Sequence, residues 1–165
     1  MRKVGFFVLI ALKKLLFERH GEGGQPARFD GDEKQLAEAA LMFHVIAADG
    51  IITAEERERF ASLLERHFGL AQAETAALME AARQADNEAI DLYGFTSILK
   101  RELDRDERFQ LIRNLWEMVY ADGVVHELED NIVWRIADLL GVEGRDRMEL
   151  KRLVKERIAD RESQG

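Results

Sequence analysis

The sequence predicts an all-α fold: a compact bundle of about seven helices with an internal pseudo-two-fold repeat, plus an N-terminal amphipathic helix. Three observations predict it. Ala, Leu, Glu and Arg, which favour helices, dominate the composition, and Pro26 is the one proline in 165 residues. Apolar residues recur at helical spacing, and no segment has the sustained alternation of a strand. Hydrophobic residues at 47% and charged residues at 34% are typical of a soluble chain of one domain.

Residues 1–20 are predicted to form a separate apolar and basic helix. Its apolar run from Val4 to Leu12 has nine residues, fewer than the ~20 of a membrane span, and two lysines then interrupt it. No small-residue cleavage pattern follows, which disfavours a signal peptide. We expect this helix to pack on its own domain or on a second copy; the alternative is peripheral membrane contact or docking on a partner. Glycines and proline mark 21–31 as a linker before a helical domain at 32–160.

Three helices are predicted in the first half of this domain, at about 32–48, 54–68 and 72–85. The second begins with a capping box, because Thr53 precedes it and Glu56 takes its third position, and it ends at Gly69. Asp86 and Asn87 break the pattern after the third helix. The residues expected on the apolar faces are Leu36, Ala39, Ala40, Phe43, Ile46 or Ala47, Phe60, Leu63, Leu64, Phe68, Ala76, Leu78, Met79 and Ala82.

Four more helices are predicted in the second half, at about 92–103, 104–120, 128–140 and 146–158. Asp104 resembles an N-cap for the second of these, and Gly141 ends the third. The residues expected on the apolar faces are Phe109, Ile112, Leu115, Trp116, Val119, Leu128, Ile132, Val133, Ile136, Leu140, Leu150, Val154 and Ile158. The basic run at 145–157 is interleaved with acids and is expected to be a solvated helix face.

Two short stretches share one pattern: 48-ADGIITAEE-56 and 121-ADGVVHELE-129. Each has Ala-Asp-Gly, then two β-branched aliphatic residues, then a Glu seven residues after the Asp. An offset of 73 residues superimposes the stretches and also maps Phe43 on Trp116 and Phe60 on Val133. The sequence therefore predicts two copies of a helix-turn-helix unit, packed with approximate two-fold symmetry.

Both stretches also match the second half of a calcium-binding helix-loop-helix. With the turn glycine at loop position 6, an aliphatic residue falls at position 8 and a Glu at position 12. The oxygen ligands needed at positions 1 and 3 are missing, because those positions hold Val45, Ala47, Met118 and Tyr120. Calcium takes roughly six to eight oxygens, so neither turn is a self-sufficient site.

Two interpretations of the turns stay open. In the first, the glycine allows the turn, the Asp bonds the turn backbone and the Glu caps the next helix. In the second, the symmetry of the repeat brings Asp49, Glu56, Asp122 and Glu129 into one site for a divalent cation, calcium or magnesium or manganese, completed by carbonyls and water. The first copy fits the cap, whereas the second copy, with His126 in place of the capping Thr, slightly favours the metal.

Other function classes have little support in the sequence. The absence of cysteine excludes thiol catalysis, and a net charge of −8 disfavours nucleic acid as a partner. The histidines lack the H-E-x-x-H spacing, no glycine-rich phosphate loop is present, and Ser62 and Ser97 lack the context of a nucleophile. We therefore expect no enzymatic activity. His44 is expected to be buried or half-buried, and Trp116 and Trp134 are expected to pack in the core.

The doubled A-D-G-[IV]-[IV]-x-x-x-E in an all-helical chain resembles the TerB family of tellurite-resistance proteins, in its cytoplasmic branch, over about 34–158. The resemblance implies a seven-helix fold with pseudo-symmetry, a link to tellurite or chemical-stress resistance, and a divalent metal at Asp49, Glu56, Asp122 and Glu129. A related domain occurs beside membrane-anchored DnaJ co-chaperones. That relation implies the alternative of a metal-free adaptor that binds a protein partner or a membrane.

Overall fold

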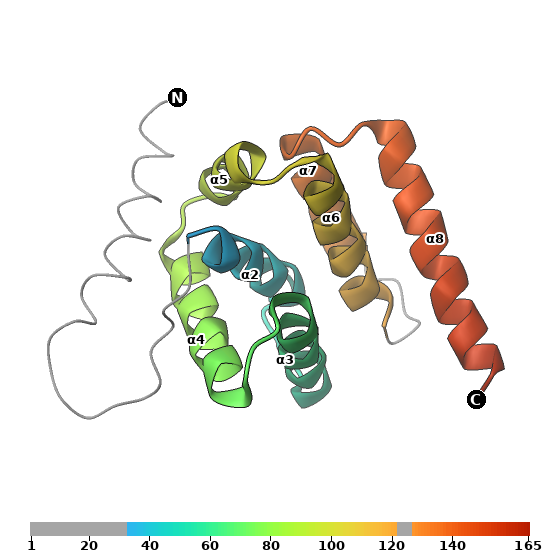
Figure 1. Ribbon diagram of the computed structural model, residues 1–165, viewed down its shortest axis with the longest axis horizontal. Coiled ribbons are helices and arrows are strands. Elements are labelled where there is room, and N and C mark those ends of the chain that lie inside the picture. The colour runs from blue at the N-terminus through green and yellow to red at the C-terminus, as the bar shows by residue number, and fades with distance from the viewer. Residues whose placement is uncertain (1–32, 122–126) are drawn as a thin grey trace, which may run out of the picture.

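The computed structural model describes residues 33–121 and 127–165, and within these ranges the chain folds into seven α-helices and no strand (Figure 1). The helices are α2 (Glu33–Ile46), α3 (Ala54–Phe68), α4 (Gln72–Glu88), α5 (Tyr93–Glu102), α6 (Arg105–Tyr120), α7 (Glu127–Leu139) and α8 (Gly144–Ser163). The predicted all-α bundle is thereby confirmed. The helix predicted at 1–20 and the linker at 21–31 lie outside the described residues.

The internal repeat is longer than the predicted helix-turn-helix unit. The same offset of 73 residues that aligns the two turns carries α2 onto α6, α3 onto α7 and α4 onto α8, with α5 as the connection. The Lys34 ammonium lies 2.9 Å from the Glu107 carboxylate, and these two residues are 73 positions apart. In a two-fold arrangement, equivalent residues meet only close to the axis. This ion pair therefore supports the predicted pseudo-two-fold symmetry.

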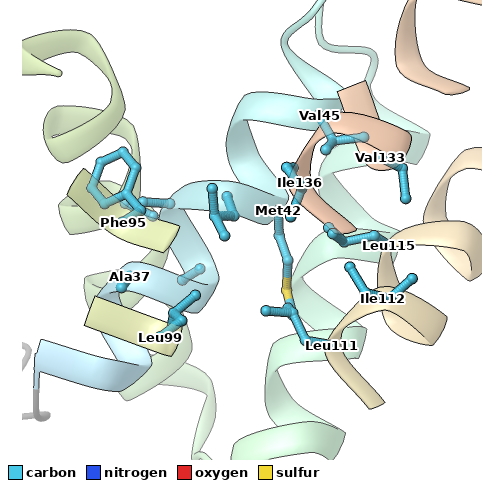
Figure 2. Packing of buried hydrophobic residues seen from close by; sticks show 14 of the residues in the cluster. Ala37, Met42, Val45, Phe95, Leu99, Leu111, Ile112, Leu115, Val133 and Ile136 are labelled. Atoms are coloured by element: carbon cyan, nitrogen blue, oxygen red, sulfur yellow. The ribbon is translucent and has the colours of Figure 1, made fainter. Parts of the chain in front are cut away.

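Helix α2 is at the centre of the bundle, where it packs against α3, α4, α5, α6 and α7 (Figure 1). Its buried residues run almost without interruption from Leu36 to Met42, and buried side chains of α5, α6 and α7 converge on them (Figure 2). Burying this apolar surface supplies the main stabilisation of the fold, at roughly 25 cal/mol per Å² removed from water. Helix α8 packs on α6 and α7 at the opposite edge from α4 (Figure 1).

Three expectations about local structure are corrected. Helix α4 does not break at Asp86 and Asn87 but continues to Glu88, because the Asp86 carboxylate meets His44 Nδ1 of α2 at 2.7 Å. Leu128 is 52% exposed, since the buried face of α7 is centred on Glu129, Val133 and Ile136 and successive residues turn by about 100°. Ala76 is likewise exposed, on the side of α4 away from its buried face.

The remaining core predictions agree with the structure. Trp116 is fully buried, and Trp134 is half-buried and packs against the core. His44 is half-buried, as expected. Among the described residues, no helix is both long enough and apolar enough to cross a membrane.

Candidate functional sites: the acidic turns and an apolar groove

The first acidic turn is stabilised by its own backbone. Gly50 has φ +82°, a conformation that favours glycine, and its N–H donates to the Ala47 carbonyl at 2.9 Å. The Asp49 side chain accepts a hydrogen bond from the Ile51 N–H at 3.0 Å. Ile51 itself is 68% exposed. This is the turn chemistry predicted for the Asp-Gly pair.

The capping box predicted at the start of α3 is confirmed. The Glu56 N–H donates to Thr53 Oγ1 at 3.2 Å, and the Thr53 N–H donates to Glu56 Oε2 at 2.8 Å. The Thr53 hydroxyl also lies 3.2 Å from Glu56 Oε2. Both first-turn carboxylates therefore already accept hydrogen bonds from their own turn, and a cation there would compete with these donors.

The second acidic turn is described only in part, because Asp122 lies outside the described residues. Glu129 is buried, with 6% of its surface exposed, whereas its equivalent Glu56 is half-buried. Within 33–121 and 127–165, no group of three or more His, Asp or Glu side chains is arranged to hold a metal ion, so Asp49, Glu56 and Glu129 do not form one by themselves. The four-carboxylate site with Asp122 stays a prediction.

An apolar groove of about 500 Å³ lies beside the first turn, between α2, α3 and α4. Six of its lining residues are apolar: Phe43, Ile46, Ile52, Phe60, Ala76 and Met79. Three charged residues complete the lining, and two of them form an ion pair, with Arg83 Nη2 2.6 Å from Glu80 Oε1. The third is Arg57. An apolar lining with charges only from these three residues fits an apolar ligand segment.

In the second half, the residue equivalent to Phe43 belongs to a cluster of aromatic rings. The Trp116 ring stacks on Tyr120, with centroids 5.7 Å apart, and meets Trp134 edge-on at 5.9 Å. Lys151 of α8 completes this aromatic cluster, because its ammonium lies 5.1 Å from the Trp116 ring and 3.0 Å from Asp130. Such contacts combine cation–π attraction with an ion pair.

The repeat shows how the two halves differ at these positions. Phe43 is equivalent to Trp116, but Ala47 and Ala61 stand where the second half has Tyr120 and Trp134. The position of Lys151 is taken in the first half by Leu78, which is fully buried. The first half therefore has no aromatic cluster of this kind.

Burial and hydrogen bonding also change the chemistry of Tyr120. Its hydroxyl donates to Asp130 Oδ1 at 2.6 Å. Burial raises the pKa of the phenol well above its ordinary value, and the hydrogen bond to the Asp130 carboxylate raises that pKa further. The phenol therefore stays protonated throughout the physiological range and acts as a hydrogen-bond donor.

A buried polar cluster joins α2, α3 and α6, and sequence reasoning missed it. Glu38 is 3% exposed, and its Oε2 lies 3.0 Å from His67 Nε2. The other ring nitrogen, Nδ1, lies 3.3 Å from the Asn114 amide nitrogen. Because both ring nitrogens have partners, His67 is not placed to act as a base on a substrate. Its partners on three helices give it a structural role.

These features define a class: an all-helical, internally repeated domain with an apolar groove between α2, α3 and α4. The chain belongs to the TerB family, since the family described as tellurite resistance protein TerB matches residues 35–152. The matched range contains both acidic turns and helices α3 to α7, which confirms the resemblance found in the sequence. Comparisons with curated proteins and with solved structures give no match.

Proposed function

We propose that this chain is a non-enzymatic, cytoplasmic TerB domain that works as an adaptor: it binds an amphipathic helical segment of a partner protein in the groove between α2, α3 and α4. We propose that this binding serves tellurite or chemical-stress resistance, and the description of the matched family as tellurite resistance protein TerB supports that role. The observation that carries the proposal is the apolar lining of the groove, which includes the half-buried Ile52, next in sequence to the exposed Ile51. Amphipathic helices bind such grooves through apolar anchors at positions i, i+3 or i+4, and i+7.

A peptide-binding experiment tests this proposal. A fluorescently labelled amphipathic peptide of leucine, phenylalanine and lysine is titrated with the full chain, and its fluorescence anisotropy is measured. Ala76 is exposed and lines the groove, so Ala76→Glu places a charge in the groove without entering the core. We expect at least a tenfold loss of affinity, because the new carboxylate would be desolvated against the peptide.

The matched control is Ala159→Glu, since Ala159 is also exposed, on α8, and does not line the groove. It should bind the peptide as the wild type does. Equal affinities of all three proteins, or no binding by any variant of the chain, would overturn the groove as the binding surface.

A second proposal is that the twin turns hold a divalent cation, calcium or magnesium or manganese, with Asp49, Glu56, Asp122 and Glu129 as ligands. The sequence of the second copy favours it, because Glu129 keeps its place seven residues after the Asp although His126 replaces the capping Thr. Against it, Asp49 and Glu56 already accept hydrogen bonds within the first turn. In this proposal the cation would stabilise the link between the two halves and so tune partner binding.

Thermal unfolding with millimolar calcium, magnesium, manganese or zinc tests the cation proposal, because a ligand that binds only the native state must raise its stability. We expect a rise in the unfolding temperature of the wild type that Asp49→Asn combined with Asp122→Asn abolishes. No change in the wild type with any metal would remove the proposal and leave the adaptor function untouched.

A further inference from the structure

We propose that the groove between α2, α3 and α4 is occupied in the free protein by residues 1–20 of the same chain, so that a partner must displace this segment. The inference rests on the proposed function, because it names the resident occupant of the groove and thereby a form of regulation. It is carried by three properties: the chemistry of the groove, the composition of the segment and the length of the chain between them.

The lining of the groove is mainly apolar and includes two aromatic rings. Phe43 and Phe60 form part of it, with ring centroids 6.4 Å apart. In the second half, Trp116, the equivalent of Phe43, packs against two further aromatic rings with a lysine beside them. An occupant of the groove must likewise offer apolar or aromatic side chains to Phe43.

Residues 1–20 have that chemistry. Val4, Val8, Leu12 and Leu15 follow the spacing of one face of an amphipathic helix. Phe6, Phe7 and Phe17 add aromatic rings, and lysines lie among these apolar residues, as Lys151 lies among the rings of the second half. An apolar segment of this size is costly to leave in water, so it requires a surface to cover it.

The connecting chain is long enough to bring the segment to the groove. Helix α2 begins at Glu33, and Phe43 and Ile46 of the same helix line the groove, roughly 15–20 Å further along at 1.5 Å per residue. Residues 21–32 can span up to about 40 Å when extended. Because the segment is tethered, its effective concentration at the groove is in the millimolar range, which favours the same chain over a second copy.

Disulfide trapping tests the contact between residues 1–20 and the groove. Because the chain has no cysteine, any disulfide that forms must join two introduced residues. Val4→Cys, Val8→Cys and Leu12→Cys are each combined with Ala76→Cys in the full chain, and the products of mild oxidation are identified by intact mass. Because two Cα atoms must approach within about 7 Å to form a disulfide, one of the three pairs should give mainly an intramolecular bond. The matched control replaces Ala76→Cys by Ala159→Cys on the far edge of the bundle, where we expect less than a tenth of that yield (Figure 1).

Equal yields at the two alanine positions would overturn the proposal. So would disulfide-linked dimers as the main product, which would assign the segment to a second copy. The oxidation is repeated in the presence of vesicles of phosphatidylcholine and phosphatidylglycerol. Failure of the intramolecular bond to form there, at ratios where the chain floats with the vesicles, would assign the segment to a membrane.

Peptide binding separates this proposal from the proposed function. In the full chain, Val8→Glu combined with Leu12→Glu should release the groove and raise the affinity for the labelled peptide about tenfold, the factor expected if the groove is closed about nine-tenths of the time. An unchanged affinity that still depends on Ala76 would overturn self-occupancy and leave the adaptor function standing. No binding to either protein would overturn the adaptor function.

Discussion

The two halves of this protein have the same order of helices, but their last helices, α4 and α8, pack through different kinds of side chain. In the first half, α4 packs through buried small residues, which let the helices approach closely: Thr75, Ala77, Ala81, Ala82 and Ala85. In the second half, α8 buries only Leu150 and Val154. Lysine and arginine side chains attach the rest of α8, including Lys151 to Asp130 and Arg157 to Glu117.

The difference teaches that one backbone repeat tolerates two solutions, and that the choice decides where a ligand can bind. Aromatic rings and Lys151 close the second half. The first half has alanines at two of the matching positions and carries the apolar groove between α2, α3 and α4. The polar groups are also divided unequally, because Glu38 and His67 are equivalent to Leu111 and Leu140, both fully buried leucines.

The largest expected effect separates the equivalent residues Trp116 and Phe43. Trp116→Ala removes a fully buried ring and should cost about 3–5 kcal/mol of unfolding free energy. Phe43→Ala removes a half-buried ring beside the groove and should cost about half as much. Urea unfolding of the two variants measures this, and equal losses would contradict the assignment of open and filled halves.

The Glu38–His67 pair should be replaceable by two leucines, the residues that stand at the equivalent positions of the second half. Glu38→Leu alone leaves His67 Nε2 without its partner in a mostly buried position and should cost about 1–3 kcal/mol. Glu38→Leu combined with His67→Leu recreates the leucines of the second half and should recover most of that loss. A double-mutant cycle by urea unfolding gives the coupling, and purely additive losses would refute the equivalence.

Lys151 should matter more than its neighbour Lys155. Lys151→Ala removes the cation that pairs with Asp130 and lies over the aromatic rings. We expect a loss of about 2 kcal/mol of unfolding free energy. Lys155 is exposed and contacts only the Tyr120 ring among the described aromatic residues, so Lys155→Ala should cost under about 1 kcal/mol. Thermal unfolding of both variants sharpens the comparison; equal shifts would show that the cluster adds nothing to the attachment of α8.

The smallest effect concerns the cap of α3. Thr53→Ala removes the acceptor of the Glu56 N–H and should cost about 1 kcal/mol, whereas Thr53→Ser keeps the hydroxyl and should cost little. Thermal unfolding measures both. If alanine and serine behave alike, the hydroxyl does not stabilise this turn.

Much of the fold could be predicted because its signals are local. The Thr53–Glu56 capping box, the Asp104 cap and the helical spacing of Ile112, Leu115 and Val119 each depend on a few neighbouring residues. The errors arose where contacts between helices override local signals. Asp86 continues a helix instead of ending it because it meets His44, 42 positions away.

Of the two candidate sites, the acidic turns could be found from the sequence and the groove could not. The four acidic residues of the turns were visible as a motif, yet their spacing alone did not decide between a cap and a cation site. The groove left no motif, because its lining comes from three helices and from Ile52 in the turn before α3. Residues so far apart in the chain meet only when the helices pack, so no local pattern marks them.

The sequence by itself determined the helices, their caps, the duplication and the family, because periodicity and capping act over one or two turns of chain. Only the tertiary structure decided which half is open, that Glu38 is buried against His67 and that Lys151 lies among aromatic rings. These outcomes depend on side-chain volume and charge summed across helices that are distant in the chain, and such sums exist only once the helices have packed.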